Sequence, residues 1–340
     1  MNGRALREAA IALLAAMAIG SLLAIAYGAR PAEVWHVLAS GTWGSGYGVG
    51  QVLYKATTLV FTGLSVAVAF RAGLFNVGAE GQMLLGALAG GLVGTQAGAL
   101  GPLAAPVVAL AAALAGASWG ALPGLLRATR GAHEVITTIM LNFVAQAVAL
   151  ALGASVFTKE SLHTAPIAEV ARLSRLSRFW PALHGSAAST ALGIALATAL
   201  GVWWWLFRSR PGLRLRLVGE SPLVAASTGA SVGRTTVGAM ALAGALAGLA
   251  SIGFVQGYKG YYEDGCASGA GFVGIAVALL GRSHPAGIVL GALLFGTLSQ
   301  GGLAINALVA KELVDILLAF VILSLAALSP EARRAFRRGV

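Results

Sequence analysis

The sequence predicts an all-α, polytopic integral membrane protein with about ten transmembrane helices, some of them short or re-entrant. Of the 340 residues, 58% are hydrophobic and only 10% are charged, which is too little charge to wet a soluble protein of this size. The apolar residues form long continuous runs, which suit spanning helices of about 20 residues better than the alternating strands of a barrel. We therefore expect a single transmembrane domain over residues 1–340.

Ten apolar runs are the candidate spans. Run 6–27 is longer than the core of a signal peptide, which predicts an uncleaved first helix. Run 271–281 is too short to cross a hydrocarbon core of about 30 Å alone, so we expect a half-helix there. The full set is 6–27, 52–70, 82–98, 103–126, 134–156, 187–207, 235–255, 271–281, 285–300 and 307–327.

The chain is strongly basic, with a formal net charge of +11. The basic residues flank the apolar runs, so we interpret them as markers of the cytoplasmic side of a membrane and not as a nucleic-acid surface. Most of the arginine falls on the inner side if both termini are cytoplasmic. The longest inner loop, 208–234, alone carries five arginines.

The external loop 157–185 does not follow this charge bias. Two prolines interrupt it, and we expect a small external helix around Ile167–Arg178. The basic residues of this loop are Lys159, Arg172, Arg175 and Arg178.

The segment FRAGLFNVGAEGQ, residues 70–82, places polar groups between two apolar runs. Polar side chains and irregular backbone at membrane depth are costly, and they survive where they line a cavity or a path. Asn76, Glu80 and Gln82 are candidate path residues because amides and carboxylates bond hydroxyl groups and base edges. Glu80 could instead cap the following helix or pair with Arg71. Phe75 could stack on a purine base or lie in the core.

Three further residues are candidates for the path. Asn142 lies in the middle of an apolar run, where it could contact a solute or hold helices together. Phe272 and Gln300 are weaker candidates in the runs 271–281 and 285–300. Asp315, four residues after Lys311, predicts a local ion pair.

The inner loop 208–234 contains the signals of a short helix. Residues 210–212, Arg-Pro-Gly, predict a turn. Ser221 is a predicted N-cap, a proline follows at the first helical position, and Gly229 is a predicted stop. The helix Pro222–Thr228 could fit a groove on a soluble partner, or the segment could be an ordinary basic loop.

Four stretches in this order and spacing resemble the membrane subunits of ABC importers for branched-chain amino acids, ribose and nucleosides. The likeness is to the nucleoside branch, for guanosine and other purine nucleosides, and to the longer of its two permease subunits. The stretches are GLRLRLVGESPLVAASTG (212–229), FRAGLFNVGAEGQMLLGA (70–87), EVITTIMLNFVA (134–145) and GFVGIAVALLGRSHPAGIVLGALLFG (271–296).

This resemblance implies a ten-helix permease of the bacterial cytoplasmic (inner) membrane with both termini cytoplasmic. The translocation path would lie between two homologous permease subunits, which are usually different chains in the nucleoside branch. A separate ATP-binding cassette subunit would supply energy, and an external substrate-binding lipoprotein would deliver intact nucleosides. The short inner helix would be the coupling helix that docks on the ATP-binding subunit. The residues that the resemblance assigns to this docking are Gly219, Glu220, Pro222, Ala225, Ala226 and Gly229.

The sequence has no GxxxxGK(S/T) phosphate loop, so ATP and Mg²⁺ are expected on a partner subunit and no cofactor on this chain. The five histidines are scattered without metal-ligand spacing, and we expect neither a metal site nor an enzyme. Two alternatives remain open. One is an ABC permease for a simple sugar such as ribose; the other is an ion-coupled transporter, for which only Glu80 and Asp315 could serve.

Overall fold

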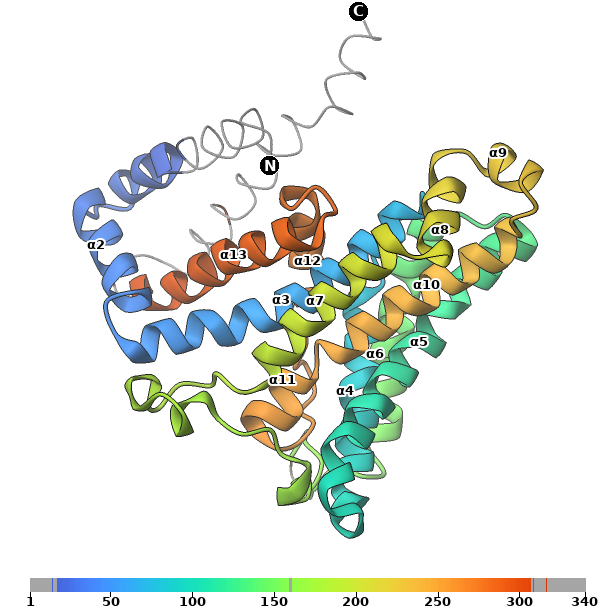
Figure 1. Cartoon of the computed structure of the whole chain (residues 1–340). Coiled ribbons are helices and arrows are strands. Elements are labelled where there is room, and N and C mark those ends of the chain that lie inside the picture. The colour runs from blue at the N-terminus through green and yellow to red at the C-terminus, as the bar shows by residue number, and fades with distance from the viewer. Residues whose placement is uncertain (1–13, 15–16, 159–160, 307, 309–315, 317–340) are drawn as a thin grey trace, which may run out of the picture.

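Figure 1 shows the computed structural model of the chain, an assembly of helices. The structure describes residue 14, residues 17–158 and 161–306, and residues 308 and 316. The first part of the predicted run 6–27 and nearly all of the predicted run 307–327, with Lys311 and Asp315, lie outside these residues. In the described part, the all-α class is confirmed.

Most of the helices are joined by short turns, and a long loop, whose described residues include three 3-10 turns, connects α6 to α7. The α-helices are α2 (Pro31–Thr42), α3 (Gly46–Arg71), α4 (Ala79–Gln96), α5 (Ala104–Arg130), α6 (Glu134–Gly153), α7 (Ala191–Arg208), α8 (Arg210–Glu220), α9 (Pro222–Ser227), α10 (Val232–Leu249), α11 (Ile252–Phe254), α12 (Ala270–Leu280) and α13 (Pro285–Ile305). The 3-10 turns are η1 (Ala97–Leu103), η2 (Glu169–Ala171), η3 (Leu176–Arg178) and η4 (Pro181–Leu183), and η5 (Val255–Lys259) is a π-helical turn.

Six helical segments of the described chain are long and apolar enough to cross a membrane, so the predicted number of about ten is not confirmed. One reason is that α4, η1 and α5 form one helical segment of 52 residues, in which the chain reverses at Gly101 with φ +51°. Another is α12, whose 11 residues fit the half-helix expected there. The six segments are Gly46–Arg71, Ala79–Arg130, Glu134–Gly153, Ala191–Arg208, Val232–Lys259 and Pro285–Ile305.

Helix α3 passes through the core of the molecule, and 83% of its most apolar stretch is buried. Its Phe61 and Leu64 belong to one buried apolar cluster with Met240 of α10, Val277 of α12 and Phe295 of α13. Figure 1 shows α7, α10, α12 and α13 beside it. This packing places the C-terminal end of α3, and the segment that follows it, against several helices at once.

Two helices were not predicted from the sequence. Helix α2 is not strongly apolar and has Pro31 in its first turn. Helix α8 begins where a turn was expected at residues 210–212, because the Ser209 hydroxyl accepts a bond from the Gly212 N–H at 3.1 Å. Proline is tolerated in a first helical turn, where its missing N–H costs nothing.

The predicted external helix at 167–178 is wrong, since η2 and η3 are separate single turns. The backbone of this loop bonds to a distant segment instead of to itself. The Ile167 N–H donates to the Gly260 carbonyl at 2.8 Å, and the Leu173 N–H donates to the Gln256 carbonyl at 3.0 Å. These donors are therefore not free to build consecutive helical turns.

Helices α5 and α10 pack backbone to backbone along a seam of glycines. A Cβ atom added to Gly116 or to Gly244 would overlap the carbonyl oxygen of the other residue. Gly120 and Gly248 continue the same seam one turn away on each helix. Small residues allow this close approach, which drives helix association where the surrounding lipid is as apolar as the side chains.

We predict that Gly244→Ala destabilises the folded protein although alanine favours helix formation. Overpacking costs typically about 1–3 kcal/mol, which exceeds the gain of about 1 kcal/mol in helix propensity. The matched control is Gly238→Ala on the same helix, where a Cβ atom would meet no atom within 4 Å. The midpoint of thermal unfolding in detergent should fall for Gly244→Ala and not for Gly238→Ala. Equal midpoints for the two variants would contradict the close packing of α5 against α10.

Candidate functional site

The segment 72–78 leaves α3 through a tight glycine turn. Gly73 has φ +71°, a conformation that residues with a Cβ atom rarely adopt. Its N–H donates to the Phe70 carbonyl at 3.1 Å, and the Leu74 N–H donates to the Ala69 carbonyl at 2.9 Å. This pattern ends a helix with a left-handed glycine and satisfies its last carbonyls.

Asn76 and Gln82 form a buried pair of amides. The Asn76 side chain donates to the Ser65 hydroxyl at 3.1 Å and to Gln82 Oε1 at 2.8 Å. Its Oδ1 accepts from Gln82 Nε2 at 3.0 Å and from the Gly78 N–H at 3.1 Å. All four bonds that an asparagine side chain can make are therefore used inside this chain. In this conformation the pair holds segment 72–78 against α3 and α4.

Asn142 of α6 holds the same segment from the other side. Its Oδ1 accepts from the Gly81 N–H at 2.9 Å, and its Nδ2 donates to the Val77 carbonyl at 3.0 Å. The Gly81 N–H lies in the first turn of α4, where backbone donors lack a partner within the helix. Asn142 thus ties α6 to the start of α4.

Glu80 connects α4 to the start of α12. Its two carboxylate oxygens accept from the N–H groups of Gly269 and Gly271, each at 2.7 Å. A carboxylate at a helix N-terminus is favoured by the bonds and by the helix dipole. Of the two structural roles considered for Glu80, capping is what the structure shows, although the capped helix is α12. Arg71 instead donates to the Ser283 carbonyl at 3.2 Å.

The remaining path candidates do not gather around this network. Phe75 is half-buried and meets Phe70 edge to face, with ring centroids 4.8 Å apart. Phe272 of α12 is 48% exposed. Gln300 is buried in α13, one residue from Ser299, whose carbonyl accepts from Lys55 near the other end of α3. The role of these residues in a path stays a prediction.

The short helix predicted in the loop 208–234 is confirmed as α9. The Ser221 hydroxyl accepts from the Val224 N–H at 3.4 Å, as an N-cap should. Gly229 has φ +81°, and the Ala230 N–H donates to the Ala225 carbonyl at 3.0 Å, which closes the helix end. Figure 1 shows α8 and α9 projecting at one end of the molecule.

The exposed face of α9 agrees with the residues named from the sequence except at Ala225, and it also includes Leu223 and Val224. Ala225 is fully buried, while Leu223 is 84% and Val224 is 52% exposed. Pro222, Ala226 and Gly229 are exposed as well. Leu223 was not named from the sequence. An apolar side chain within an arginine-rich loop is the signal that could have singled it out.

Helix α8 touches segment 72–78 through two glycines. A Cβ atom on Gly219 would overlap the Arg71 carbonyl and lie 2.8 Å from the Gly73 nitrogen. A Cβ atom on Gly73 would lie 3.0 Å from the Gly219 carbonyl oxygen. Glu220, next to this contact, is the exposed last residue of α8. The approach of α8 to the end of α3 therefore depends on glycine at both positions.

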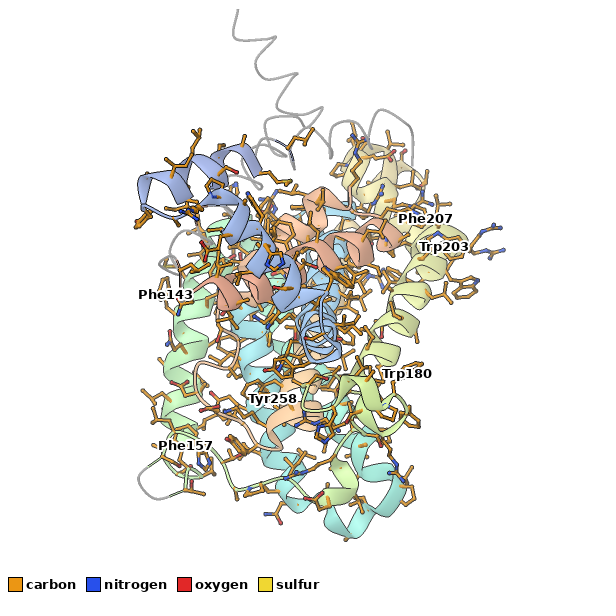
Figure 2. All side chains as sticks on the ribbon, turned by 90° about the vertical axis from the view of Figure 1, so that its left-hand side faces the viewer. Phe143, Phe157, Trp180, Trp203, Phe207 and Tyr258 are labelled. Atoms are coloured by element: carbon orange, nitrogen blue, oxygen red, sulfur yellow. The ribbon has the colours of Figure 1, made fainter. Side chains whose placement is uncertain are left out.

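Phe207 strengthens the same junction with two cation–π contacts. The guanidinium groups of Arg71 and Arg216 lie 5.4 and 5.3 Å from its ring centroid. His284, before α13, lies 5.5 Å from the same ring. Burial, and then the Arg71 charge, lower the pKa of His284, so its neutral Nδ1 can accept from the Ala286 N–H. Figure 2 shows Phe207 at the α8 end of α7.

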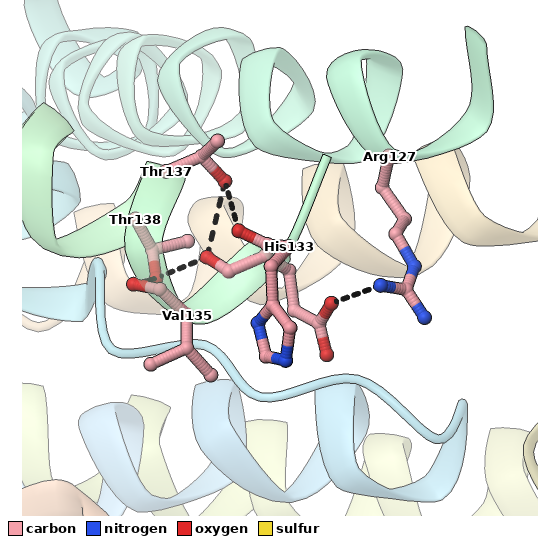
Figure 3. A network of polar contacts seen from close by, with 6 residues as sticks. Arg127, His133, Val135, Thr137 and Thr138 are labelled. Atoms are coloured by element: carbon pink, nitrogen blue, oxygen red, sulfur yellow. Dashed lines mark hydrogen bonds and ion pairs between the residues drawn. The ribbon is translucent and has the colours of Figure 1, made fainter. Parts of the chain in front are cut away.

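The junction of α5 and α6 is fixed by an ion pair (Figure 3). Arg127 Nη1 lies 2.9 Å from Glu134 Oε2, and the Glu134 residue is only 6% exposed. The Thr138 hydroxyl donates to the Glu134 carbonyl at 2.7 Å. This pair fixes the start of α6, the helix that carries Asn142.

A family model described as "Branched-chain amino acid transport system / permease component" matches residues 48–326. The chain belongs to this permease family. The expectation from the four stretches is therefore confirmed, and the protein is a multi-pass membrane permease and not itself an enzyme. No solved structure matches the chain.

Named relatives cover nearly the whole permease. The guanosine ABC transporter permease protein NupP of Bacillus subtilis is 37% identical over 93% of this chain and 91% of its own length. The glucose ABC transporter permease protein TsgB13 of Haloferax volcanii is 32% identical over 97% of this chain and 89% of its own length. The nucleoside ABC transporter permease protein NupB of Lactococcus lactis is 32% identical over 93% of this chain and 89% of its own length. Each of these organisms has a second, less similar relative.

We predict that Glu80→Gln lowers the transport rate by about tenfold or more without preventing assembly. Glutamine keeps one acceptor but turns an NH₂ group toward a backbone N–H, and a hydrogen bond to a charged group contributes roughly 1.5–3 kcal/mol. The control is Glu263→Gln, which removes a partly exposed ion pair with Lys259 at 3.1 Å. Initial transport rates and the yield of assembled complex measure both effects. An unchanged transport rate for Glu80→Gln would contradict the prediction and would mean that Glu80 has only a structural role.

Proposed function

We propose that this permease is one membrane subunit of an ABC importer that carries nucleosides across the bacterial cytoplasmic membrane. The observation that carries the proposal is the similarity to permeases named for guanosine and for nucleosides, at 37% and 32% identity over 93% of the chain. Both termini lie in the cytoplasm, on the side of α9, in agreement with the arginine-rich loop 208–234.

The energy comes from a separate ATP-binding subunit, which binds ATP and Mg²⁺ and docks on α9. The support is the shape of α9, a capped helix with an exposed Leu223 on a projecting tip. Motion of α9 passes through α8 to Gly219, and from there to Gly73 and segment 72–78. The bonds of Glu80 and Asn142 then carry it to α12 and α6.

The translocation path lies between this permease and a second, homologous permease subunit, which is a different chain. The second relative found in each of three organisms supports such a pair. In this arrangement Asn76, Gln82 and Asn142 shape the wall of the path, while Phe272 presents an exposed ring to it. Phe75 and Glu80 lie beside this wall, and Gln300 lies farther along the proposed path on α13, near Lys55. An external lipoprotein delivers the solute to the side opposite α9.

A sugar is the second candidate for the solute. The specific observation in its favour is the glucose permease relative, which is 32% identical over 97% of the chain. Uptake assays separate the two solutes directly.

The test is uptake into proteoliposomes that contain this permease with its neighbouring permease, ATP-binding and binding-protein subunits. We expect ATP-dependent accumulation of radiolabelled guanosine that other nucleosides inhibit and glucose does not. Inhibition by glucose and indifference to nucleosides would favour the sugar. Uptake by the isolated permease with an ion gradient and no ATP would contradict the proposal.

Leu223→Ala should weaken binding of the ATP-binding subunit by about tenfold, since truncation of an apolar anchor at an interface costs more than about 1 kcal/mol. The matched control is Leu213→Ala, a 49% exposed leucine of α8. Co-purification and nucleoside-stimulated ATP hydrolysis are the readouts. Equal losses in both variants would show that Leu223 is not the docking residue.

A further inference from the structure

A cavity of about 300 Å³ lies between the external loop and the π-helical turn η5. This volume is at the lower end of the range for small-molecule sites. The residues that line it and matter here are Glu169, Arg172, Arg175, Arg178, Gln256 and Tyr258. Figure 2 shows Tyr258 well removed from Phe207, so the cavity is not part of the α8 junction.

Gln256 lines this cavity and holds a buried acceptor that no group of the described chain uses. The residue is 2% exposed, and its Nε2 donates to the carbonyls of Ala105 and Ala171 at 3.0 and 2.8 Å. Both amide hydrogens are thus committed, while Oε1 has no hydrogen-bond partner. A buried acceptor without a donor costs roughly 1–3 kcal/mol. A ligand with a donor group removes this cost.

Other residues that line the cavity supply donors and a second acceptor. Arg175 is fixed in place, because its two Nη atoms donate to the carbonyls of Ser186 and Tyr258 at 2.8 and 2.9 Å. Arg172 pairs with Glu169 at 3.3 Å. Arg178 is exposed at the rim. Each guanidinium has five N–H donors, so the two outer arginines keep donors for a ligand.

This mixture of groups selects the kind of ligand. A simple anion would satisfy the arginines but leave the Gln256 acceptor unpaired and repel the Glu169 carboxylate. A solute with hydroxyl and ring N–H donors, as well as ring and carbonyl acceptors, matches the acceptors of Gln256 and Glu169 and the donors of the arginines. The Tyr258 ring, which is 40% exposed, also lines the cavity and carries the Arg175 guanidinium 5.2 Å from its centroid. A purine nucleoside has all of these features.

We propose that this cavity is an external nucleoside-binding site that holds the solute before it enters the translocation path. The proposal rests on the proposed function and deepens it. The nucleoside bridges the loop 169–178 and η5, which already share the bond from the Leu173 N–H to the Gln256 carbonyl. Its donor reaches Gln256 Oε1 once the side chains at the mouth of the cavity move aside.

The test is binding of radiolabelled guanosine to the complex of permease and ATP-binding subunits in nanodiscs, without the binding protein. We expect saturable binding that Arg178→Ala weakens by about fivefold or more, because it removes charged donors from the ligand. Gln256→Met, which removes the acceptor and also the two Nε2 bonds to the Ala105 and Ala171 carbonyls, is the second variant and should weaken binding as well. The control is Arg30→Ala, an exposed arginine before α2 that does not line the cavity.

Photolabelling with 8-azidoguanosine and mass spectrometry give the position of the ligand. Label on residues 169–178 or 255–259 supports the site, and label confined to other segments overturns it. Displacement of guanosine by inorganic phosphate or by an acidic peptide also overturns it, because the arginines then serve an anion. If guanosine uptake depends on ATP but no guanosine binds in nanodiscs, the proposed site is contradicted and the proposed function stands. If guanosine binds in nanodiscs but is not taken up in proteoliposomes, the binding site stands and the proposed function is contradicted.

Discussion

Two glycines let helix α8 touch the end of α3 backbone to backbone, and the proposed coupling of α9 to the rest of the permease depends on this contact. A side chain at Gly219 would overlap the Arg71 carbonyl, and Gly73 faces it in a left-handed conformation that favours glycine. The cation–π contacts of Phe207 with Arg71 and Arg216 hold the same two elements together. In the proposed coupling, this contact is the route by which α9 acts on segment 72–78.

The polar groups of segment 72–78 and of the first turn of α4 join this region to three other helices. Asn76 and Gln82 close a buried amide pair against α3, Asn142 reaches in from α6, and Glu80 caps α12. Each bond lies where few waters can replace it, so breaking one leaves an unsatisfied group. The proposed import mechanism uses this network as a unit, because such networks switch between discrete arrangements instead of deforming gradually.

Local signals in the sequence predicted much of this architecture, and long-range contacts account for what it missed. The apolar runs predicted α3 to α7, and Ser221 with Gly229 predicted α9, because spans and caps depend on neighbouring residues. The start of α8 was mistaken for a turn, since a proline fits both. The partners of Glu80 could not be predicted, because Gly269 and Gly271 are 189 and 191 residues away in the chain. The burial of Ala225 likewise depends on tertiary packing.

The coupling contact is tested most directly by Gly219→Ala, with the number of nucleosides imported per ATP hydrolysed as the readout. The added methyl group should separate α8 from segment 72–78 at a cost of about 1–3 kcal/mol, so hydrolysis should continue while the ratio falls several-fold. The control is Gly233→Ala, where the added Cβ atom would meet only Ala128 at 3.6 Å. A ratio in Gly219→Ala equal to that of the unmodified permease would contradict the account.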